Sequence, residues 1–513
     1  MGNTKKKNGF ASGIGFILAS AGSAVGLGNL CQFPYKTSVN GGAAFVFVYI
    51  LCVLVLGSTA MIAEIYIGRR AQANTVSSFK KVNPKIGWIG LIVLFIPFLI
   101  TCYYSVLGGW TIRSTINSFQ AVEQANNMNS LGIFTSNPYE PVIYTGLFIL
   151  LAAIIIMAGV KGGIEKASKV LMPILFIILL ILVIYCLFLG EGVSKGLDFY
   201  LNPRFDELGF EGVIAAMGQA FFSLSLGMGI MISYGSYTGK EIKLGRSVAL
   251  ISLFDTLVAL FAGLMIFSAI GALSPNDFEN TQGVMLIYSI LPKVFNNMGE
   301  IGKTVSFLFF AMVSIAAITS VMSLMEVVAQ FVIQKFKTPR KKAILIIGAI
   351  CLVISIPISW SVGGAFNGKL MFGEYDILTF IDEMTNTVLM PIGALGACVA
   401  LGWLMAKPTK KTDIFSAKFL YKQLSKDGLK LGKFGNFFAV MVKYVTPIII
   451  ISLEVLGIMG NVKKYGNSYW LIVGSAYALL LACVILYFVF FKKKDCGNNA
   501  DELIIEKEAV PEK

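Results

Sequence analysis

The sequence contains no histidine in 513 residues, and only 14% of its residues are charged, against 56% that are hydrophobic. The lack of histidine excludes histidine-based zinc sites, histidine proton relays and Ser-His-Asp catalysis. A soluble protein normally carries about a quarter charged residues. Apolar runs of about twenty residues, enough to span roughly 30 Å of hydrocarbon as helices, recur along the chain. We therefore expect one bundle of membrane helices and no separate soluble domain.

The eight cysteines form no disulfide or metal-binding pattern. Most of them lie inside apolar runs, where cysteine acts as a small buried hydrophobe; these are Cys52, Cys102, Cys186, Cys351, Cys398 and Cys483. The net charge of +14 comes from lysines and arginines in short loops between apolar runs. No basic recognition helix is present, so we expect no nucleic-acid partner.

The N-terminus has the outline of a cleavable signal peptide, with Lys5–Lys7 followed by an apolar stretch and the small residues Ala19-Ser20-Ala21. The apolar segment does not stop there, however, and continues to Pro34 through a glycine-rich stretch. We therefore expect this segment to be retained as the first span.

Hydropathy windows of about twenty residues predict about twelve spans. They fall at 11–36, 42–68, 87–120, 141–159, 166–189, 213–237, 247–272, 303–335, 342–361, 376–405, 438–460 and 468–491. Cations concentrate in alternate loops, such as Arg69–Lys85 and Lys335–Lys342, whereas Gln120–Pro141 and Leu273–Ile301 hold few. By the positive-inside rule, both termini face the cytoplasm. We expect a multi-pass protein of the inner (plasma) membrane of the cell.

Two of these spans contain glycine-rich interruptions, at Gly22–Asn29 in the first span and at Ser223–Gly229 in the sixth. Glycine weakens a helix by roughly 1 kcal/mol relative to alanine. Taken singly, each segment could be a close-packing interface of small residues. Opened backbone at mid-membrane depth, by contrast, is tolerated only where it is buried in protein or lines a cavity.

The positions of the two interruptions favour a binding site, because they lie five spans apart. That spacing is expected if spans one to five and six to ten form an inverted repeat with the site at mid-membrane. The predicted fold is therefore an all-α polytopic membrane protein. Its parts are a cytoplasmic tail at 1–10, the five-span repeats 11–190 and 209–405, spans eleven and twelve at 437–492, and a cytoplasmic tail at 493–513.

Five motifs, in order along the chain, resemble those of the neurotransmitter:sodium symporters, in particular the bacterial transporters of hydrophobic and aromatic amino acids. They are Gly22–Tyr35 in the first span, Tyr103-Tyr104 in the third, Gly162–Lys166 entering the fifth, Gly218–Gly229 in the sixth and Thr319-Ser320 in the eighth. The resemblance covers nearly the whole chain. It implies sodium-coupled uptake of an amino acid by alternating access, without covalent chemistry, so we expect no enzyme activity.

The resemblance also implies two sodium sites built from oxygen ligands. The first would use the carbonyl of Ala24 with Asn29, Ser223 and Asp255. The second would use the carbonyls of Gly22, Val25 and Ala316 with the hydroxyls of Thr319 and Ser320. Hydroxyls of this kind can equally be hydrogen-bonding links between helices.

Asp255 departs from the family pattern, which places an amide at this position. An ionised carboxylate within an apolar span costs several kcal/mol unless it has a partner. It could stay protonated or pair with a loop lysine; we favour a sodium ligand. Because many animal members of the family also bind chloride, a built-in carboxylate would replace that ion, and we expect transport that needs no chloride. Proton uptake by Asp255 on the return step is a weaker hypothesis.

Gly26 indicates the substrate class, because monoamine-transporting relatives carry an aspartate at this position. Glycine leaves room for a substrate that brings its own carboxylate, namely an α-amino acid. Tyr104 is expected to bind that carboxylate and Phe222 to cover the site. The predicted substrate site is mostly apolar and uncharged, which favours a large hydrophobic or aromatic side chain; it comprises Ser23, Ala24, Leu27, Gly28, Ile100, Tyr104, Phe222, Ser223, Ser225, Met228, Ser320 and Leu324.

Both gates depart from the family pattern of ion pairs. Outside, Gln32 takes the place of an arginine and faces Asp382, so a weaker hydrogen bond is predicted; Phe222 and Tyr104 complete this gate. Inside, Lys7 and Phe10 replace the usual arginine and tryptophan. Gln334 stands where relatives carry an aspartate on span eight.

Two further functions are compatible with such an architecture. A proton-coupled amino-acid carrier would lack sodium dependence and would want a protonatable group at Thr319 or Ser320. A non-transporting trafficking or receptor-like relative would have degraded ion ligands, which here look intact. The partners predicted for the favoured function are an amino acid, sodium ions and the lipid bilayer.

Overall fold

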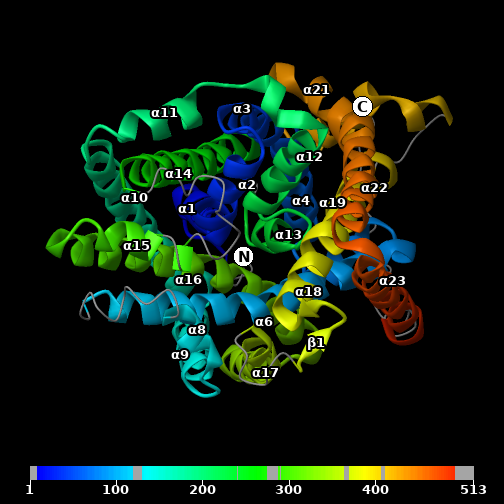
Figure 1. Cartoon of the computed structure of the whole chain (residues 1–513). Helices are drawn as coiled ribbons and strands as arrows, with labels where there is room; N and C mark the ends of the chain where they lie inside the picture. Colours follow the sequence, from blue (N-terminus) through cyan, green and yellow to red (C-terminus); the bar gives the residue numbers. More distant parts are fainter. Residues whose placement is uncertain are drawn as a thin grey trace, which may run out of the picture.

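The computed structural model describes residues 9–119, 130–239, 241–273, 287–288, 291–362, 369–405 and 411–491. Over these residues the chain is almost entirely helical (Figure 1). The strands β1 (Met371–Phe372) and β2 (Tyr375–Asp376) form a short antiparallel hairpin, in which Met371 pairs with Asp376. The predicted all-α fold is confirmed.

The membrane-crossing segments follow the predicted order. Short π-helical or 3-10 turns, labelled η, interrupt or extend several of them. Outside the two broken spans, they are α3–η2–α4 (Ala43–Cys52, Val53–Gly57, Ser58–Ala71), α6 (Gly87–Asn117), α9 (Glu140–Met157), η4–α10 (Val160–Glu165, Lys166–Leu187), α14 (Leu244–Leu273), α16 (Glu300–Phe336), α17 (Arg340–Val362), α18–η7–α19–η8 (Ile377–Glu383, Met384–Leu389, Met390–Val399, Ala400–Leu404), α21–η11–α22 (Gly435–Val440, Met441–Val445, Thr446–Tyr465) and α23–η13 (Tyr469–Leu486, Tyr487–Phe491).

Short elements connect these spans, and most of them lie in loops for which the sequence predicted no structure. They are α5 (Thr75–Val82), η3 (Pro84–Ile86), α8 (Ser130–Ser136), α11 (Val193–Leu201), α15 (Leu291–Asn296), η9 (Lys411–Phe415), α20 (Ala417–Lys426), η10 (Gly432–Phe434) and η12 (Gly466–Ser468). Polar caps begin some of them. The Asn74 side chain, for example, accepts the Ser77 N–H at 3.0 Å and starts α5.

Within the described residues, nine helical segments are long and apolar enough to cross a membrane, and a bent pair adds a tenth. One of the nine, Gly432–Phe491, contains both the eleventh and the twelfth predicted spans, joined at η12. The remaining predicted span, the sixth, is broken over six residues, Leu224–Gly229. The prediction of about twelve spans therefore agrees with the structure; the division into two five-span repeats stays a prediction.

The first span is the bent pair. It consists of α1 (Gly13–Ala24) and the joined helices η1 (Gly28–Gln32) and α2 (Phe33–Val39), which meet at 49°. The sixth span consists of α12 (Phe205–Ser223) and α13 (Ile230–Ser236). The two interruptions predicted from the glycines are therefore both present.

The broken first span lies at the centre of the bundle, with α14, α13 and α16 around it (Figure 1). From Gly15 to Ala24, every residue except Leu18 is buried. The outer helices α9, α10, α17 and α23 expose large apolar side chains instead, such as Ile154, Ile177, Val353 and Leu481. Exposed apolar faces on the outside and a buried centre are what a lipid-embedded bundle requires.

Candidate functional site

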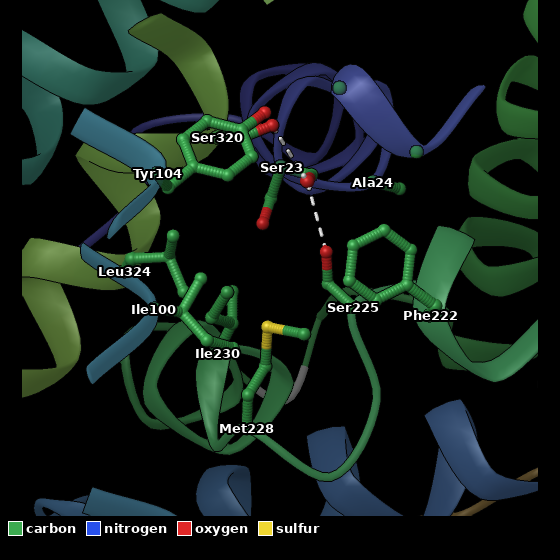
Figure 2. Close-up of a pocket in the computed structure, with 12 residues that line it drawn as sticks. Ser23, Ala24, Ile100, Tyr104, Phe222, Ser225, Met228, Ile230, Ser320 and Leu324 are labelled. Carbon is green, nitrogen blue, oxygen red and sulfur yellow. Dashed lines mark hydrogen bonds between the residues drawn. The ribbon is translucent and has the colours of Figure 1, made fainter. Parts of the chain in front are cut away.

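A small cavity of about 30 Å³ lies between the two broken spans (Figure 2). By its size it has room for one or two water molecules. A larger guest therefore requires the lining side chains to move apart. The lining residues are Ser23, Ala24, Gly26, Gly28, Ile100, Tyr104, Phe222, Ser225, Met228, Ile230, Ser320 and Leu324.

Ten of the twelve predicted substrate-site residues line this cavity. The two exceptions are Leu27, whose N–H donates to the Tyr104 hydroxyl at 3.1 Å, and Ser223, which belongs to the polar cluster described below. Gly26 and Ile230 line the cavity although they were absent from the predicted set. Ile230 is the first residue of α13. Its place in the sequence, two residues after the predicted Met228, was the signal that could have identified it.

The cavity has a polar end and an apolar end. At the polar end, the Ser225 hydroxyl donates to the Ser23 carbonyl at 2.9 Å, and Tyr104 and Ser320 lie beside it (Figure 2). At the other end lie the apolar side chains of Ile100, Met228, Ile230 and Leu324, and the Phe222 ring closes one side (Figure 2). Such a site fits a small molecule that has a polar head and an apolar side chain.

Gly26 is packed so closely that the site has no space for a side chain there. A Cβ atom on this residue would lie 2.6 Å from the Ser320 hydroxyl oxygen and 2.8 Å from the Tyr104 hydroxyl oxygen. A larger residue such as aspartate would occupy the polar end of the cavity itself. Glycine therefore keeps these two hydroxyls accessible to a guest.

Behind the cavity, three of the four predicted first sodium ligands form one buried polar cluster. The Asn29 amide donates to the Ser223 hydroxyl at 2.9 Å and to the Asp255 carboxylate at 2.7 Å. Ser223 also donates to both oxygens of Asp255, at 2.8 and 2.9 Å. Ala24 lines the adjoining cavity.

The sequence did not single out Tyr49, which completes this cluster. Its hydroxyl lies 3.1 Å from both the Ser223 hydroxyl and the Asp255 carboxylate, and the side chain is fully buried. No motif contains Tyr49, because its position depends on how α3 packs against the other spans. The Asp255 carboxylate is therefore partnered by three side chains rather than by a loop lysine.

The predicted second sodium ligands also lie together, between α1 and α16. The Ser320 hydroxyl is 3.2 Å from the Val25 carbonyl, and the Thr319 hydroxyl is 3.0 Å from the Ala316 carbonyl. A Cβ atom on Gly22 would lie 3.3 Å from Cβ of Thr319. Carbonyl and hydroxyl oxygens of this kind suit a hard monovalent cation.

The predicted hydrogen bond of the outer gate is not formed. Asp382 accepts from the Asn386 amide at 2.7 Å, and among the described residues Gln32 makes no hydrogen bond with it. One helical turn beyond Gln32, the positive charge of Lys36 interacts favourably with the carboxylates of Glu383 and Asp382. Glu383 is also held by hydrogen bonds from Thr387 and from the Tyr469 hydroxyl, at 2.9 and 3.1 Å.

At the other end of the bundle, the predicted gate residues have separate partners. Lys7 lies outside the described residues. The Phe10 N–H donates to the Tyr237 carbonyl at 3.2 Å, and the Phe10 ring packs against Tyr234. Gln334 accepts from the backbone and the side chain of Asn74, both at 2.9 Å, and so holds α16 to the start of α5.

Two buried carboxylates stabilise the same end. Glu326 accepts from the Tyr237 hydroxyl at 2.7 Å and pairs with Arg340. Glu165 accepts from the Ala11 N–H at 2.6 Å and from Ser12 at 2.9 Å, so the start of α1 is bound to the start of the fifth span. Partnered buried charges of this kind fix the position of helix ends.

Glu64 acts on the break in the sixth span. Its carboxylate accepts the Gly227 N–H at 2.7 Å, as expected for a carboxylate that satisfies opened backbone. A buried N–H without a partner costs about 1–3 kcal/mol. Glu64 therefore stabilises the unwound segment.

Comparisons with known proteins agree with this arrangement. The sequence model of the Sodium:neurotransmitter symporter family matches residues 7–131 and 140–494. The chain is 33% identical over 466 residues to the uncharacterized sodium-dependent transporter YhdH of Bacillus subtilis, covering 88% of this chain and 98% of that protein. It is 32% identical over 470 residues to an uncharacterized sodium-dependent transporter of Haemophilus influenzae, with the same coverage.

A solved structure is similar as well. The crystal structure of MhsT in complex with L-phenylalanine matches with a TM-score of 0.77 and 34% sequence identity. The match covers 88% of this chain and 99% of that chain. Fold and sequence motifs therefore point to one family.

Proposed function

Because this chain belongs to the sodium:neurotransmitter symporter family, a family of membrane transporters, we propose that it carries an α-amino acid into the cell together with sodium ions. The observation that carries the proposal is the pair of broken spans. Their unwound backbone and polar side chains meet at a cavity whose other end is apolar. Half-helix ends of this kind bind ionic groups at mid-membrane.

The substrate we propose is a large hydrophobic or aromatic amino acid. Its carboxylate would lie at the Tyr104 hydroxyl, beside Gly26, and its side chain between Ile100, Met228 and Leu324. These walls carry no charge, so an acidic or basic side chain would be buried without a partner. The crystal structure of MhsT is a complex with L-phenylalanine, an amino acid of this class. Met228 is flexible, which suits a cavity that must widen for its guest.

Two sodium ions are proposed as co-substrates. The first would be bound by Ala24, Asn29, Ser223 and Asp255, and the second by Gly22, Val25, Ala316, Thr319 and Ser320. The Asp255 carboxylate already supplies a negative charge among these ligands, 2.7 Å from the Asn29 amide. This supports transport without chloride, although one human relative, XTRP3, is named as sodium- and chloride-dependent.

The proposed cycle is alternating access in the cell membrane, with both termini in the cytoplasm. Phe222, Tyr104, Gln32 and Asp382 would close the outer path. Phe10, Gln334 and Lys7 would close the inner one. The membrane potential drives the inward movement of sodium by about 2.3 kcal/mol per charge per 100 mV.

The experiment is uptake of radiolabelled tryptophan, tyrosine and leucine into proteoliposomes, with and without an inward sodium gradient. Sodium-dependent accumulation of at least one of them is expected, with no uptake of glutamate or lysine. Protein-free liposomes provide the control. Replacing chloride by gluconate should leave the rate nearly unchanged; a collapse would exclude the chloride-independent mechanism.

The same assay separates the alternatives. Uptake that follows a proton gradient in the absence of sodium would indicate a proton-coupled carrier. If amino acids neither bind nor accumulate under any gradient, the chain is a non-transporting relative. The hydrogen-bonded ligand clusters at Asp255 and at Ser320 favour sodium coupling over both.

A further inference from the structure

The connection between the tenth and eleventh spans, called the surface segment below, consists of η9, α20 and η10 and covers residues 411–434. Two contacts fix it to the bundle. The Tyr421 hydroxyl of α20 accepts the Leu431 N–H at 3.1 Å, just before η10 and the eleventh span. The Arg70–Asp427 ion pair, at 2.6 Å, holds the end of α20 to the end of the second span. The surface segment is therefore a docked part of the fold.

The helix α20 has an apolar face and a basic face. Leu420 and Leu424 are buried against the bundle. Lys418, Lys422 and Lys426 are all exposed, and because they repeat every four residues they share one face of the helix. Like charges at this spacing destabilise a helix. A negative surface opposite this face would remove that repulsion.

The positive charge of the surface segment is not balanced within the fold. Two further exposed lysines, Lys430 and Lys433, follow the helix. None of these five lysines forms an ion pair with a residue that the structure describes. Of the two acidic residues of the segment, Asp427 is paired with Arg70, and Asp413 lies at the other end, in η9. The counter-charge for the lysine face therefore has to come from outside these residues.

Aromatic side chains indicate the level of the membrane surface beside this segment. The Phe415 ring, at the end of η9, lies 5.9 Å from that of Trp403 in the tenth span, and Trp403 lies 5.6 Å from Tyr444 in the eleventh. The Trp403 indole donates to the Lys443 carbonyl at 2.9 Å, and the Lys443 ammonium lies 4.8 Å from the same ring. Tryptophan and tyrosine at the ends of spans are typical of the interface between lipid and water. The start of α20 therefore lies at this interface.

Large apolar side chains are exposed at both ends of α20. Phe415, just before the helix, is 65% exposed, and Phe434, in η10, is 75% exposed. Segments that combine exposed aromatic side chains with lysines lie in the membrane interface, where the aromatic rings enter the boundary of the acyl chains. Lysine side chains are long enough to reach the headgroups from that depth.

We propose that the surface segment lies on the membrane and binds anionic phospholipids, such as phosphatidylglycerol. The lysine face of α20 contacts their phosphates, and Phe415 and Phe434 enter the acyl boundary on either side of the helix. Charge complementarity selects the partner, because each lysine near an anionic membrane surface strengthens binding about fivefold. A membrane of neutral lipids offers the phenylalanines a place but leaves the lysines without a counter-charge.

A soluble phosphate ion shares the chemistry of the headgroup, but the exposed rings favour the lipid. A phosphate ion would leave Phe415 and Phe434 in water, whereas a lipid surface also buries their apolar area. The proposal does not depend on the transport activity. Only the assignment of the leaflet rests on the proposed cytoplasmic position of this face.

The test is amide hydrogen exchange of residues 411–434 in the full-length protein, in nanodiscs of phosphatidylcholine alone or of phosphatidylcholine and phosphatidylglycerol in equal parts. Phosphatidylglycerol should slow the exchange of the surface segment at least about fivefold, the effect of a single lysine at an anionic surface. Inorganic phosphate added to phosphatidylcholine nanodiscs should not slow it. The variant K418Q/K422Q/K426Q should lose most of the slowing, and K418R/K422R/K426R should keep it. Phe434→Ser should exchange faster in both kinds of nanodisc, and Phe434→Leu should not.

The matched control is K243Q/K341Q/K342Q. It removes the same number of exposed lysines from the connections after the sixth and eighth spans, on the same face of the bundle, and the slowing should persist. Equal losses in the two glutamine variants would overturn the proposal, because the lipid effect would then follow net charge alone. Exchange that is already slow in phosphatidylcholine and unchanged by phosphatidylglycerol would overturn it as well, since contact with protein would then protect the segment. Amino-acid uptake is measured separately in proteoliposomes, so a negative result here does not bear on transport.

Discussion

The two broken spans look alike in sequence, since both are short glycine-rich segments, but they use glycine for different reasons. The first break is short, and its glycines have ordinary negative φ angles. The sixth-span break, Leu224–Gly229, contains three residues with positive φ: Ser225 at 54°, Gly227 at 78° and Gly229 at 73°. Only the second break therefore requires left-handed backbone.

In the first break, glycine provides space. Cβ atoms on Gly26 and Gly28 would lie 2.6 Å from the Ser320 hydroxyl and 2.7 Å from the Phe222 ring. These neighbours are side-chain atoms that can move. A Cβ atom on Gly227 would lie 2.1 Å from the Met390 carbonyl, which belongs to the backbone of another helix. The first break can therefore adapt and shapes the cavity, whereas the glycine of the second break allows two spans to pack backbone to backbone.

The largest expected effect is that of Gly227→Ala. Left-handed backbone costs a non-glycine residue about 1–3 kcal/mol, and the backbone overlap with Met390 adds to that cost. Little monodisperse protein should be recovered, as measured by size-exclusion chromatography of detergent extracts. Gly218→Ala on the same span is the control, because no atom lies within 4 Å of its added Cβ. Equal recovery of the two variants would remove the distinction between the breaks.

The two breaks meet at Asp255, which bonds to Asn29 of the first span and to Ser223 of the sixth. Asp255→Asn keeps the shape of the side chain but removes its negative charge. The new amide N–H would also point toward one of the three groups that donate hydrogen bonds to the carboxylate. A hydrogen bond to a charged group contributes about 1.5–3 kcal/mol, so the sodium concentration for half-maximal uptake should rise roughly tenfold or more. Sodium titration of uptake measures this. An unchanged sodium response would exclude Asp255 from the ligand set.

Gly26→Ala should have a smaller effect and, unlike Gly227→Ala, should leave the protein folded. Overpacking costs about 1–3 kcal/mol. Because the Ser320 and Tyr104 hydroxyls can move, we expect a cost at the lower end of this range, so uptake should fall roughly fivefold. The Tm should change by only a few degrees, as about 1 kcal/mol does in a chain of this size. Full uptake would mean that the cavity at Gly26 does not hold the substrate head group.

The smallest effect is expected at the outer end of the first span. Lys36→Gln removes the cation that faces Glu383 and Asp382. Partly exposed pairs contribute about 0–1 kcal/mol, so uptake should change about twofold at low ionic strength and less at high salt. Lys36→Arg should behave like the unmodified protein. A loss of more than tenfold, independent of salt, would show that Lys36 has a role beyond charge pairing.

Some features could be predicted from single segments of sequence. The apolar runs predicted the spans, and the motifs in the first, third, sixth and eighth spans together contain most of the cavity lining. The hydrogen bond predicted between Gln32 and Asp382 is absent, because Asn386, one turn further along the same span, satisfies the carboxylate instead. Local pairs of this kind compete with distant ones, and a pattern of residue types does not rank them.

By itself, the sequence determined that the chain crosses the membrane many times and where two of the spans break, because hydropathy and glycine content are local properties. Tertiary structure alone decided that Tyr49 joins the Asp255 cluster, that Ile230 lines the cavity, and that α20 packs against the start of the eleventh span. It also decided what each glycine does. Whether a missing Cβ provides space or permits left-handed backbone depends on the atoms of other spans, which the local sequence does not contain.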